Sequence, residues 1–151
     1  HHEQSQRVPL VIFDPRQPKQ HRGRTVDTMV LNLDLPATFL DWAEAPIPAS
    51  YQGASLKPMI EGKATLETWR KDFFCEHFNP RYAMSWEGVR GQRFKYARYL
   101  DQKPAYEFLH DLKGDPDELI NLATNPEYAA QLKLMRQRTD ALAEGYVNAL
   151  D

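Results

Sequence analysis

The chain has 151 residues, of which 42% are hydrophobic and 11% are aromatic, so its composition is that of a folded protein rather than a disordered one. Nineteen basic and twenty-one acidic residues give a net charge of −2, which supplies no strong field to attract nucleic acid or an anionic membrane. A single cysteine excludes an internal disulfide, and the apolar runs are too short to span a bilayer. The opening HHEQSQRVPL predicts a start inside a longer chain, and His1 and His2 are either natural residues or the remnant of a purification tag.

The first predicted element is a buried strand at Val8–Phe13. Its sequence, VPLVIF, is almost unbroken apolar and closes at Asp14-Pro15. Such runs are typical of strands that are covered on both faces of a parallel sheet. The polar segment that follows, Arg16–Arg24, predicts a basic surface loop; most such loops are simply solvated, and some bind anions.

A helix is predicted next, from Asp34 to the proline pair Pro46 and Pro48. Asp34 is a favourable N-cap, and Pro36 suits the first helical turn. The apolar face predicted for this helix consists of Phe39, Leu40, Trp42 and Ala43. The loop-like segment 49–63 that follows predicts a boundary, with one part at 1–62 and a second at 63–151.

The second part changes to short strands. One strand is predicted at Phe73–His77, and MSWEGVRGQRFKYARYL predicts a hairpin that turns near Gly91-Gln92. Another strand is predicted at Tyr106–Leu112. Consecutive strands joined by short turns indicate an antiparallel sheet.

Two helices are predicted after the last strand. Gly114, Asp115, Pro116 and Glu118 have the spacing of a turn followed by a capping box, which predicts a short helix from Asp115. Asn125 followed by a proline predicts the start of a long helix. That helix carries an apolar stripe at spacings of three and four, which predicts docking on the sheet, with a coiled coil as the alternative: Tyr128, Leu132, Met135, Thr139, Leu142 and Tyr146.

Six segments cover nearly the whole chain in order: EQSQRVPLVIFDP, VDTMVLNLDLPATFLDWA, YQGASLKPMIEG, WRKDFFCEHF, GVRGQRFKYARY and YEFLHDLKGDPDELINLA. Together they resemble the motifs of the type I, formylglycine-dependent sulfatases of the alkaline-phosphatase-like superfamily. The departures are few. Pro36-Ala37-Thr38 reorders the usual A-P-T, Glu44 replaces a glycine, and His110 replaces a tyrosine.

The resemblance implies an α/β fold, α+β overall. Residues 1–62 would be the C-terminal part of an alkaline-phosphatase-like α/β core, and residues 63–151 a small antiparallel sheet packed by a long C-terminal helix. It implies a parent enzyme that hydrolyses sulfate esters with formylglycine and calcium, whose nucleophile and metal ligands lie upstream of this chain. The chain itself would then hold no cofactor, metal site or catalytic residue, and alone we predict it to be inactive.

The implied partners are the upstream sulfatase core and a sulfated small molecule or glycan, with no nucleic acid and no membrane span. A dimer formed through the exposed Val8–Phe13 strand is also expected. A periplasmic or secreted location fits the family.

The sequence excludes one candidate catalytic residue and suggests several candidate substrate-binding residues. Cys75 is not the formylglycine precursor, because C/S-x-P-x-R requires proline and arginine where His77 and Asn79 stand. By resemblance, His77, Glu76 and His2 are candidates for substrate binding. Glu3 is interpreted as the partner of a nearby arginine such as Arg7.

Two alternatives remain open at this point. The chain could be a non-catalytic module that binds an anionic glycan through the Arg16–Arg24 loop. It could also be the tail of a related phosphate or phosphonate ester hydrolase.

Overall fold

The computed structural model describes residues 2–63, 67–82 and 84–148. The chain divides into two compact units. The first nine residues join the residues from Lys71 onward in one, called here the sheet unit, and Leu10–Arg70 forms the other, called the helical unit. The predicted division of the protein into domains at 62/63 stays a prediction. None of the described helices combines the length and apolar character needed to cross a bilayer.

The helical unit contains η1 (Lys19–His21), α2 (Asp34–Trp42) and α3 (Lys57–Ile60). Helix α2 lies where it was predicted. The prediction of its apolar face was wrong in part, because Phe39 is 60% exposed and the buried residues are Asp34, Ala37 and Thr38. The helix ends before Glu44, whose φ of 54° is left-handed. A glycine adopts that conformation without strain, which explains why the resembling family prefers one there.

The predicted strand at Val8–Phe13 is not formed. The segment forms no regular secondary structure, and Val11 and Phe13 are 88% and 83% exposed. A strand needs hydrogen-bonding neighbours, and each of the described strands pairs within the sheet of residues 72–111 instead. An apolar run without a pairing partner is therefore left uncovered.

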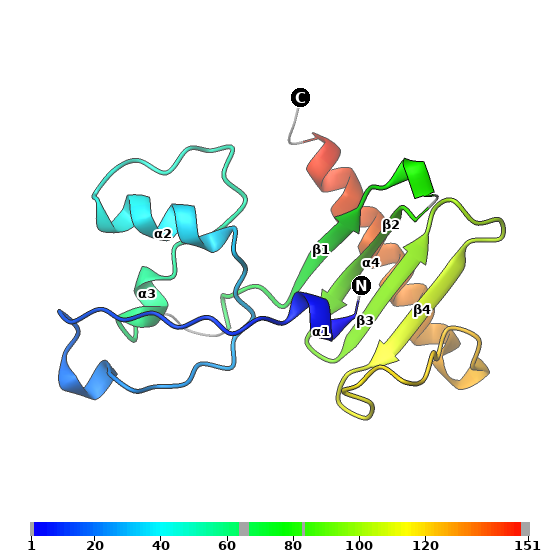
Figure 1. The fold of residues 1–151 in the computed structure, drawn as a ribbon, viewed down its shortest axis with the longest axis horizontal. Coiled ribbons are helices and arrows are strands. Elements are labelled where there is room, and N and C mark those ends of the chain that lie inside the picture. The colour runs from blue at the N-terminus through cyan, green and yellow to red at the C-terminus, as the bar shows by residue number, and fades with distance from the viewer. Residues whose placement is uncertain (1, 64–66, 83, 149–151) are drawn as a thin grey trace. The chain divides into compact units, whose positions relative to one another are not determined.

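The predicted antiparallel sheet is confirmed. It contains β1 (Asp72–His77), β2 (Trp86–Gly91), β3 (Phe94–Tyr99) and β4 (Tyr106–Asp111) in sequential order (Figure 1). All three pairings are antiparallel. A 3-10 turn, η2 (Pro80–Tyr82), lies between β1 and β2.

The long helix and its docking on the sheet are also confirmed. The Asn125 side chain accepts a hydrogen bond from the Glu127 N–H, η3 (Pro126–Tyr128) follows, and α4 spans Ala129–Asn148. In Figure 1, α4 lies behind the sheet. The core joins both elements and consists of Val89, Tyr96, Leu109, Leu132 and Met135.

The prediction of a short helix from Asp115 is wrong, because the chain forms turns there. The Asp115 carboxylate does accept a backbone hydrogen bond, from the Ile120 N–H at 2.7 Å. Glu118, however, has a left-handed φ of 56° and a buried side chain, so it cannot close a capping box. Its carboxylate is held by other partners.

The sheet face opposite α4 carries the short helix α1 (Glu3–Gln6), which lies in front of the sheet in Figure 1. Residues directly opposed on neighbouring strands share a face. The register therefore places three rows of side chains on this second face: His77, Trp86, Tyr99 and Tyr106; Cys75, Gly88, Ala97 and Phe108; and Phe73, Arg90, Lys95 and His110.

Candidate functional site

The first of these rows is aromatic across all four strands. The His77 and Trp86 rings are stacked with centroids 6.5 Å apart, and Phe108 of the adjoining row contacts Tyr99 at 5.9 Å and Tyr106 at 4.8 Å. His77 and Tyr106 are exposed at the two ends of the row. These rings gather apolar surface on the second face of the sheet, with the two Phe108 contacts in edge-to-face geometry.

The middle row is small by necessity at Gly88. A Cβ at this position would lie 2.1 Å from the Tyr96 carbonyl oxygen, so any larger residue would force β2 and β3 apart. Ala97, its cross-strand neighbour, is buried. The middle row therefore has small residues at Gly88 and Ala97, between Cys75 and Phe108.

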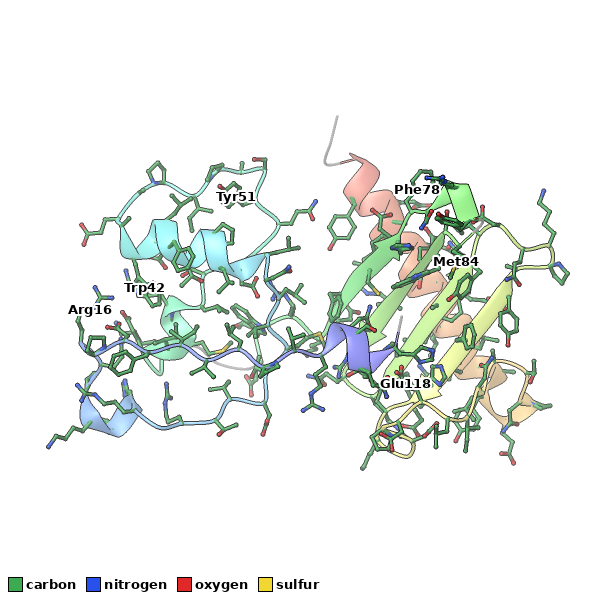
Figure 2. The ribbon with its side chains drawn as sticks, in the orientation of Figure 1. Arg16, Trp42, Tyr51, Phe78, Met84 and Glu118 are labelled. Carbon is green, nitrogen blue, oxygen red and sulfur yellow. The ribbon has the colours of Figure 1, made fainter. Side chains whose placement is uncertain are left out.

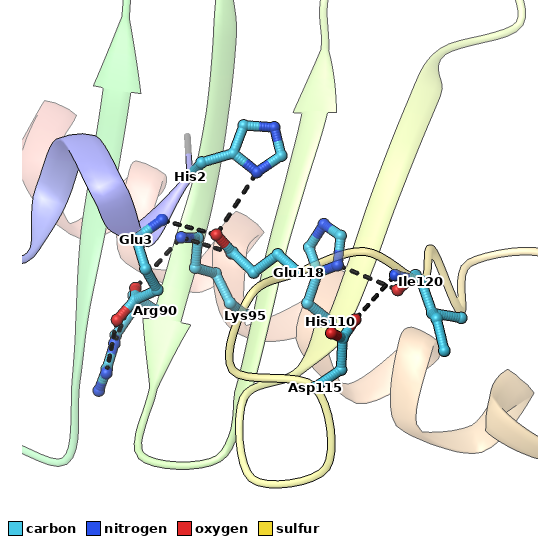
Figure 3. Close-up of polar contacts among 8 residues, drawn as sticks. All are labelled: His2, Glu3, Arg90, Lys95, His110, Asp115, Glu118 and Ile120. Atoms are coloured by element: carbon cyan, nitrogen blue, oxygen red, sulfur yellow. Dashed lines mark hydrogen bonds and ion pairs between the residues drawn. The ribbon is translucent and has the colours of Figure 1, made fainter.

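The third row contains a buried ion-pair cluster (Figure 3). Lys95 is 1% exposed and Glu118 is fully buried, and the Lys95 Nζ lies 2.7 Å from Glu118 Oε1. The same ammonium donates to Glu3 Oε1 at 3.1 Å, and Arg90 pairs with Glu3 Oε2 at 3.0 Å. The Glu3 backbone N–H donates to Glu118 Oε2 at 2.6 Å.

Glu3 therefore pairs with Arg90 and Lys95, whereas Arg7 was the expected partner. Burial alone would raise the pKa of Glu3, but the hydrogen bonds and charges of Arg90 and Lys95 outweigh it and lower the pKa. The carboxylate is thus held ionised. It fastens α1 to the sheet.

Two histidines adjoin this cluster. His2 Nδ1 lies 3.4 Å from Glu118 Oε2, and its ring is 6.0 Å from that of His110 and 6.4 Å from that of Phe108. His110 Nδ1 lies 3.1 Å from the Ile120 carbonyl oxygen. Burial lowers the pKa of His110, which favours its neutral form. One nitrogen of each ring and one Glu118 oxygen lie within 4.8 Å of one another.

Beside the cluster is a small pocket of about 230 Å³. Its lining is mostly polar and comes from α1 and the loop ends of the sheet: Glu3, Arg7, Arg90, Gln92, Leu112, Lys113 and Pro116. The pocket is below the usual size of a small-molecule site, so it supports no ligand assignment by itself.

Residues 1–145 match the family model described as N-sulphoglucosamine sulphohydrolase, C-terminal. The chain belongs to this family. It is 33% identical to N-acetylglucosamine-6-O-sulfatase of Bacteroides thetaiotaomicron over 96% of its own length and 26% of that protein. It is 30% identical to an arylsulfatase of Clostridium perfringens over 97% of its length and 30% of that protein. The chain thus spans under a third of the length of these relatives.

Solved structures agree with this assignment. BT4656 in complex with its substrate D-glucosamine-2-N,6-O-disulfate is similar with a TM-score of 0.68 and 31% identity, covering 76% of this chain and 24% of that one. A phosphonate monoester hydrolase of Agrobacterium radiobacter has a TM-score of 0.69 and 26% identity, covering 83% and 27%. The fold is therefore that of the sulfatase and alkaline-phosphatase-like proteins, with the predicted antiparallel sheet and C-terminal helix.

Three of the family motifs interlock inside the helical unit around Asp34. Its carboxylate accepts the Leu31 N–H at 2.7 Å and the Ala54 N–H at 2.9 Å, and it pairs with Arg70. Gly53 permits this approach, because a Cβ there would lie 1.8 Å from the Leu33 carbonyl oxygen. Burial raises the pKa of Asp34, but Arg70 and the two N–H groups outweigh it and lower the pKa. These motifs are therefore architectural.

A second set of contacts joins α2 to the start of α3. The Leu56 N–H donates to Thr38 Oγ1 at 2.8 Å, and the Lys57 Nζ donates to Asp41 Oδ1 at 3.1 Å. The Trp69 indole N–H donates to the Met29 carbonyl at 2.7 Å. Each of these hydrogen bonds satisfies a polar group in or beside a loop, within the segments that resemble the family motifs.

The arginines of the Arg16–Arg24 loop bond to nearby residues of the loop and to α3. Arg16 pairs with Asp14 and lies over the Trp42 ring at 5.9 Å (Figure 2). Arg22 donates to the Gln17 and Pro15 carbonyls, and Arg24 donates to the Met59 and Ile60 carbonyls of α3. Guanidinium groups engaged in this way are not arranged as an anion-binding surface.

Cys75 has the environment of a packing residue. Its Sγ lies 3.7 Å from the Gly88 carbonyl oxygen, and burial raises the pKa of the thiol. A raised pKa disfavours the thiolate that nucleophilic chemistry requires. His77 shares its sheet face, two residues along β1.

The family commonly uses a metal together with formylglycine. The sequence contains no C/S-x-P-x-R. Among the described residues, the one group of three possible ligands is His2, His110 and Glu118, which has two nitrogen donors. Calcium, the metal that the resemblance implies, prefers an all-oxygen set, so this group does not fit a calcium ion.

Sequence reasoning missed the Lys95–Glu118 pair. The signal available was the K-Y of FKYARY and the Glu of the D-P-D-E segment, which both fall in family-like motifs. His77, Glu76 and His2 were predicted to bind substrate. The structure brings His2 and His77 to the same face of the sheet as Phe108, and Glu76 alternates to the other face at the edge strand.

Proposed function

We propose that this chain is the C-terminal portion of a sulfatase, in which it buttresses the catalytic core and shapes the substrate pocket. The observation that carries the proposal is the family match over residues 1–145, together with relatives that are sulfatases. The nucleophile and calcium site belong to the part of the longer protein upstream of this chain. That upstream core is the chain's partner.

His77 is the residue that we propose contacts the substrate most directly. It is exposed, lies at the end of the edge strand β1 and stacks on Trp86. Glu76 is also exposed, and a ligand that lies along the strand edge can contact both side chains although they alternate in direction. His2 adds a third contact from the same face as His77.

The substrate class that we propose is a sulfated amino sugar. The relative with 33% identity is an N-acetylglucosamine-6-O-sulfatase, and BT4656 binds D-glucosamine-2-N,6-O-disulfate as its substrate. The aromatic row offers apolar faces against which a sugar ring can pack, while His77 supplies a hydrogen-bonding group at its exposed end.

A pair of substrates tests this role. We expect His77→Ala in the complete protein to lower kcat/KM for glucosamine-6-sulfate by about tenfold, the effect of losing one useful polar contact of about 1.4 kcal/mol. Turnover of a small aryl sulfate, which has no sugar ring to position, should change by less than about twofold. His21→Ala, which removes a histidine of the helical unit, is the control. Equal losses on both substrates would make His77 a packing residue.

The second candidate is a phosphonate monoester hydrolase, favoured by the TM-score of 0.69 to the Agrobacterium radiobacter enzyme. Comparing sulfate and phosphonate monoesters of the same aryl alcohol discriminates the two. Faster release from the phosphonate would replace the sulfatase proposal. The glycan-binding module has less support, because the loop arginines are engaged with neighbouring residues of the chain and with α3.

A further inference from the structure

The geometry points to a zinc-binding site formed by His2, His110 and Glu118 on the sheet face that carries α1. These ligand types, two imidazoles and one carboxylate, suit Zn²⁺ with a fourth position left for water. The three ligand atoms lie within 4.8 Å of one another. The inference does not rest on the proposed function.

The separation of two of the ligands already matches zinc. Zinc–ligand bonds of about 2.0–2.2 Å at tetrahedral angles place ligand atoms about 3.4 Å apart. His2 Nδ1 lies 3.4 Å from Glu118 Oε2. His110 then has to approach by roughly an ångström, which rotation of the half-exposed His2 ring and a small shift of α1 can supply.

The surroundings prepare each ligand for a metal. The Nδ1 of His110 donates to the Ile120 carbonyl, so its Nε2 carries the lone pair, as in metal sites whose histidines are oriented by a backbone carbonyl (Figure 3). Glu118 is fixed by Lys95 on Oε1 and by the Glu3 N–H on Oε2, and the second lone pair of Oε2 is the one that a metal would take.

The charges of the cluster limit the affinity. Glu3 and Glu118 together balance Lys95 and Arg90, so an added Zn²⁺ meets no excess of negative charge. The Lys95 ammonium also lies on the other oxygen of the same carboxylate. We therefore expect weaker binding than at a closed structural zinc site with thiolate ligands.

The experiment uses Co²⁺ as a probe, in the complete protein purified without a polyhistidine tag and stripped of metal. Tetrahedral Co²⁺ with nitrogen ligands absorbs visible light far more strongly than octahedral Co²⁺ in an oxygen site. The variants are His110→Tyr, which installs the residue of the resembling family, and His2→Phe, which alters a half-exposed side chain. The matched control, His21→Tyr, removes a histidine elsewhere.

We expect the wild type and His21→Tyr to show an intense visible band that about one equivalent of Zn²⁺ abolishes. Both site variants should lose the band and bind Zn²⁺ at this site at least about tenfold more weakly, and Zn²⁺ should raise Tm more where the site is intact. Other sites of the protein contribute equally to every variant, so the difference spectrum reports this one. Absence of the band from the wild type, or its persistence in both site variants, would overturn the inference.

Discussion

At the scale of single residues, the Lys95–Glu118 pair shows what a short-range reading of the sequence cannot predict. Side chains alternate along β3, so Lys95 and its neighbour Tyr96 point to opposite faces of the sheet. In a strand with one buried face, Lys95 would then be expected on the solvent side. Its partner Glu3 is instead 92 positions away. Glu118 was predicted as a capping residue, because its local spacing fits a capping box as well as it fits a buried partner.

Loss of the Lys95 charge should destabilise the sheet unit strongly. We expect Lys95→Met to lower the free energy of unfolding by about 3–5 kcal/mol, because Glu118 and Glu3 would remain as buried carboxylates without their ammonium partner. Chemical denaturation followed by circular dichroism measures this change. The control is Lys133→Met on the exposed side of α4, for which we expect a change within about 0.5 kcal/mol.

The double variant Lys95→Met/Glu118→Gln should recover part of this loss, since a neutral amide no longer requires a buried counter-charge. If Lys95→Met and Lys133→Met changed stability equally little, the cluster would be only a surface feature.

At the scale of elements, sequence patterns predicted most of the sheet unit. Period-two alternation and a glycine turn were sufficient for β2 and β3, and the stripe along α4 predicted its buried face, because both signals arise from residues close together in the chain. The prediction of a strand at Val8–Phe13 was wrong because strand formation depends on segments that are distant in the chain. An apolar run becomes a strand only beside partner strands, and its own sequence does not supply them.

The buried face of α4 can be tested with two leucines that differ in position alone. Leu132 belongs to the core, and Leu134 is 59% exposed. We expect Leu132→Ala to cost about 2–5 kcal/mol of stability through lost burial and a residual cavity. Leu134→Ala should cost less than about 0.5 kcal/mol. A larger effect at Leu134 than at Leu132, measured by urea denaturation, would mean that α4 packs through another face.

At the scale of the whole molecule, the chain supplies candidate substrate-binding residues but no nucleophile motif. The described residues build a sheet face with aromatic and charged rows, whereas the motif for the nucleophile is absent from the sequence. Sequence resemblance located the pocket candidates at His77, Glu76 and His2. Only the strand register shows which of them share a face, because register depends on pairings between distant segments.

The exposed Val8–Phe13 segment should make the isolated chain self-associate. We expect sedimentation velocity to show dimers or larger species at micromolar concentration, since an uncovered apolar run can pair with another chain. The double variant Val11→Lys/Phe13→Lys should shift the population toward monomer. An unmodified chain that stays monomeric at all concentrations would contradict this expectation and remove the proposed dimer.

The most direct test of the central claim measures sulfate release by the complete protein and by this chain alone. The substrates are glucosamine-6-sulfate and an aryl sulfate, with and without added calcium. We predict metal-dependent release by the complete protein and none by the chain, because the chain has no formylglycine motif. Turnover by the chain alone, or a complete protein that releases no sulfate from either ester, would contradict the assignment of this chain as the non-catalytic part of a sulfatase.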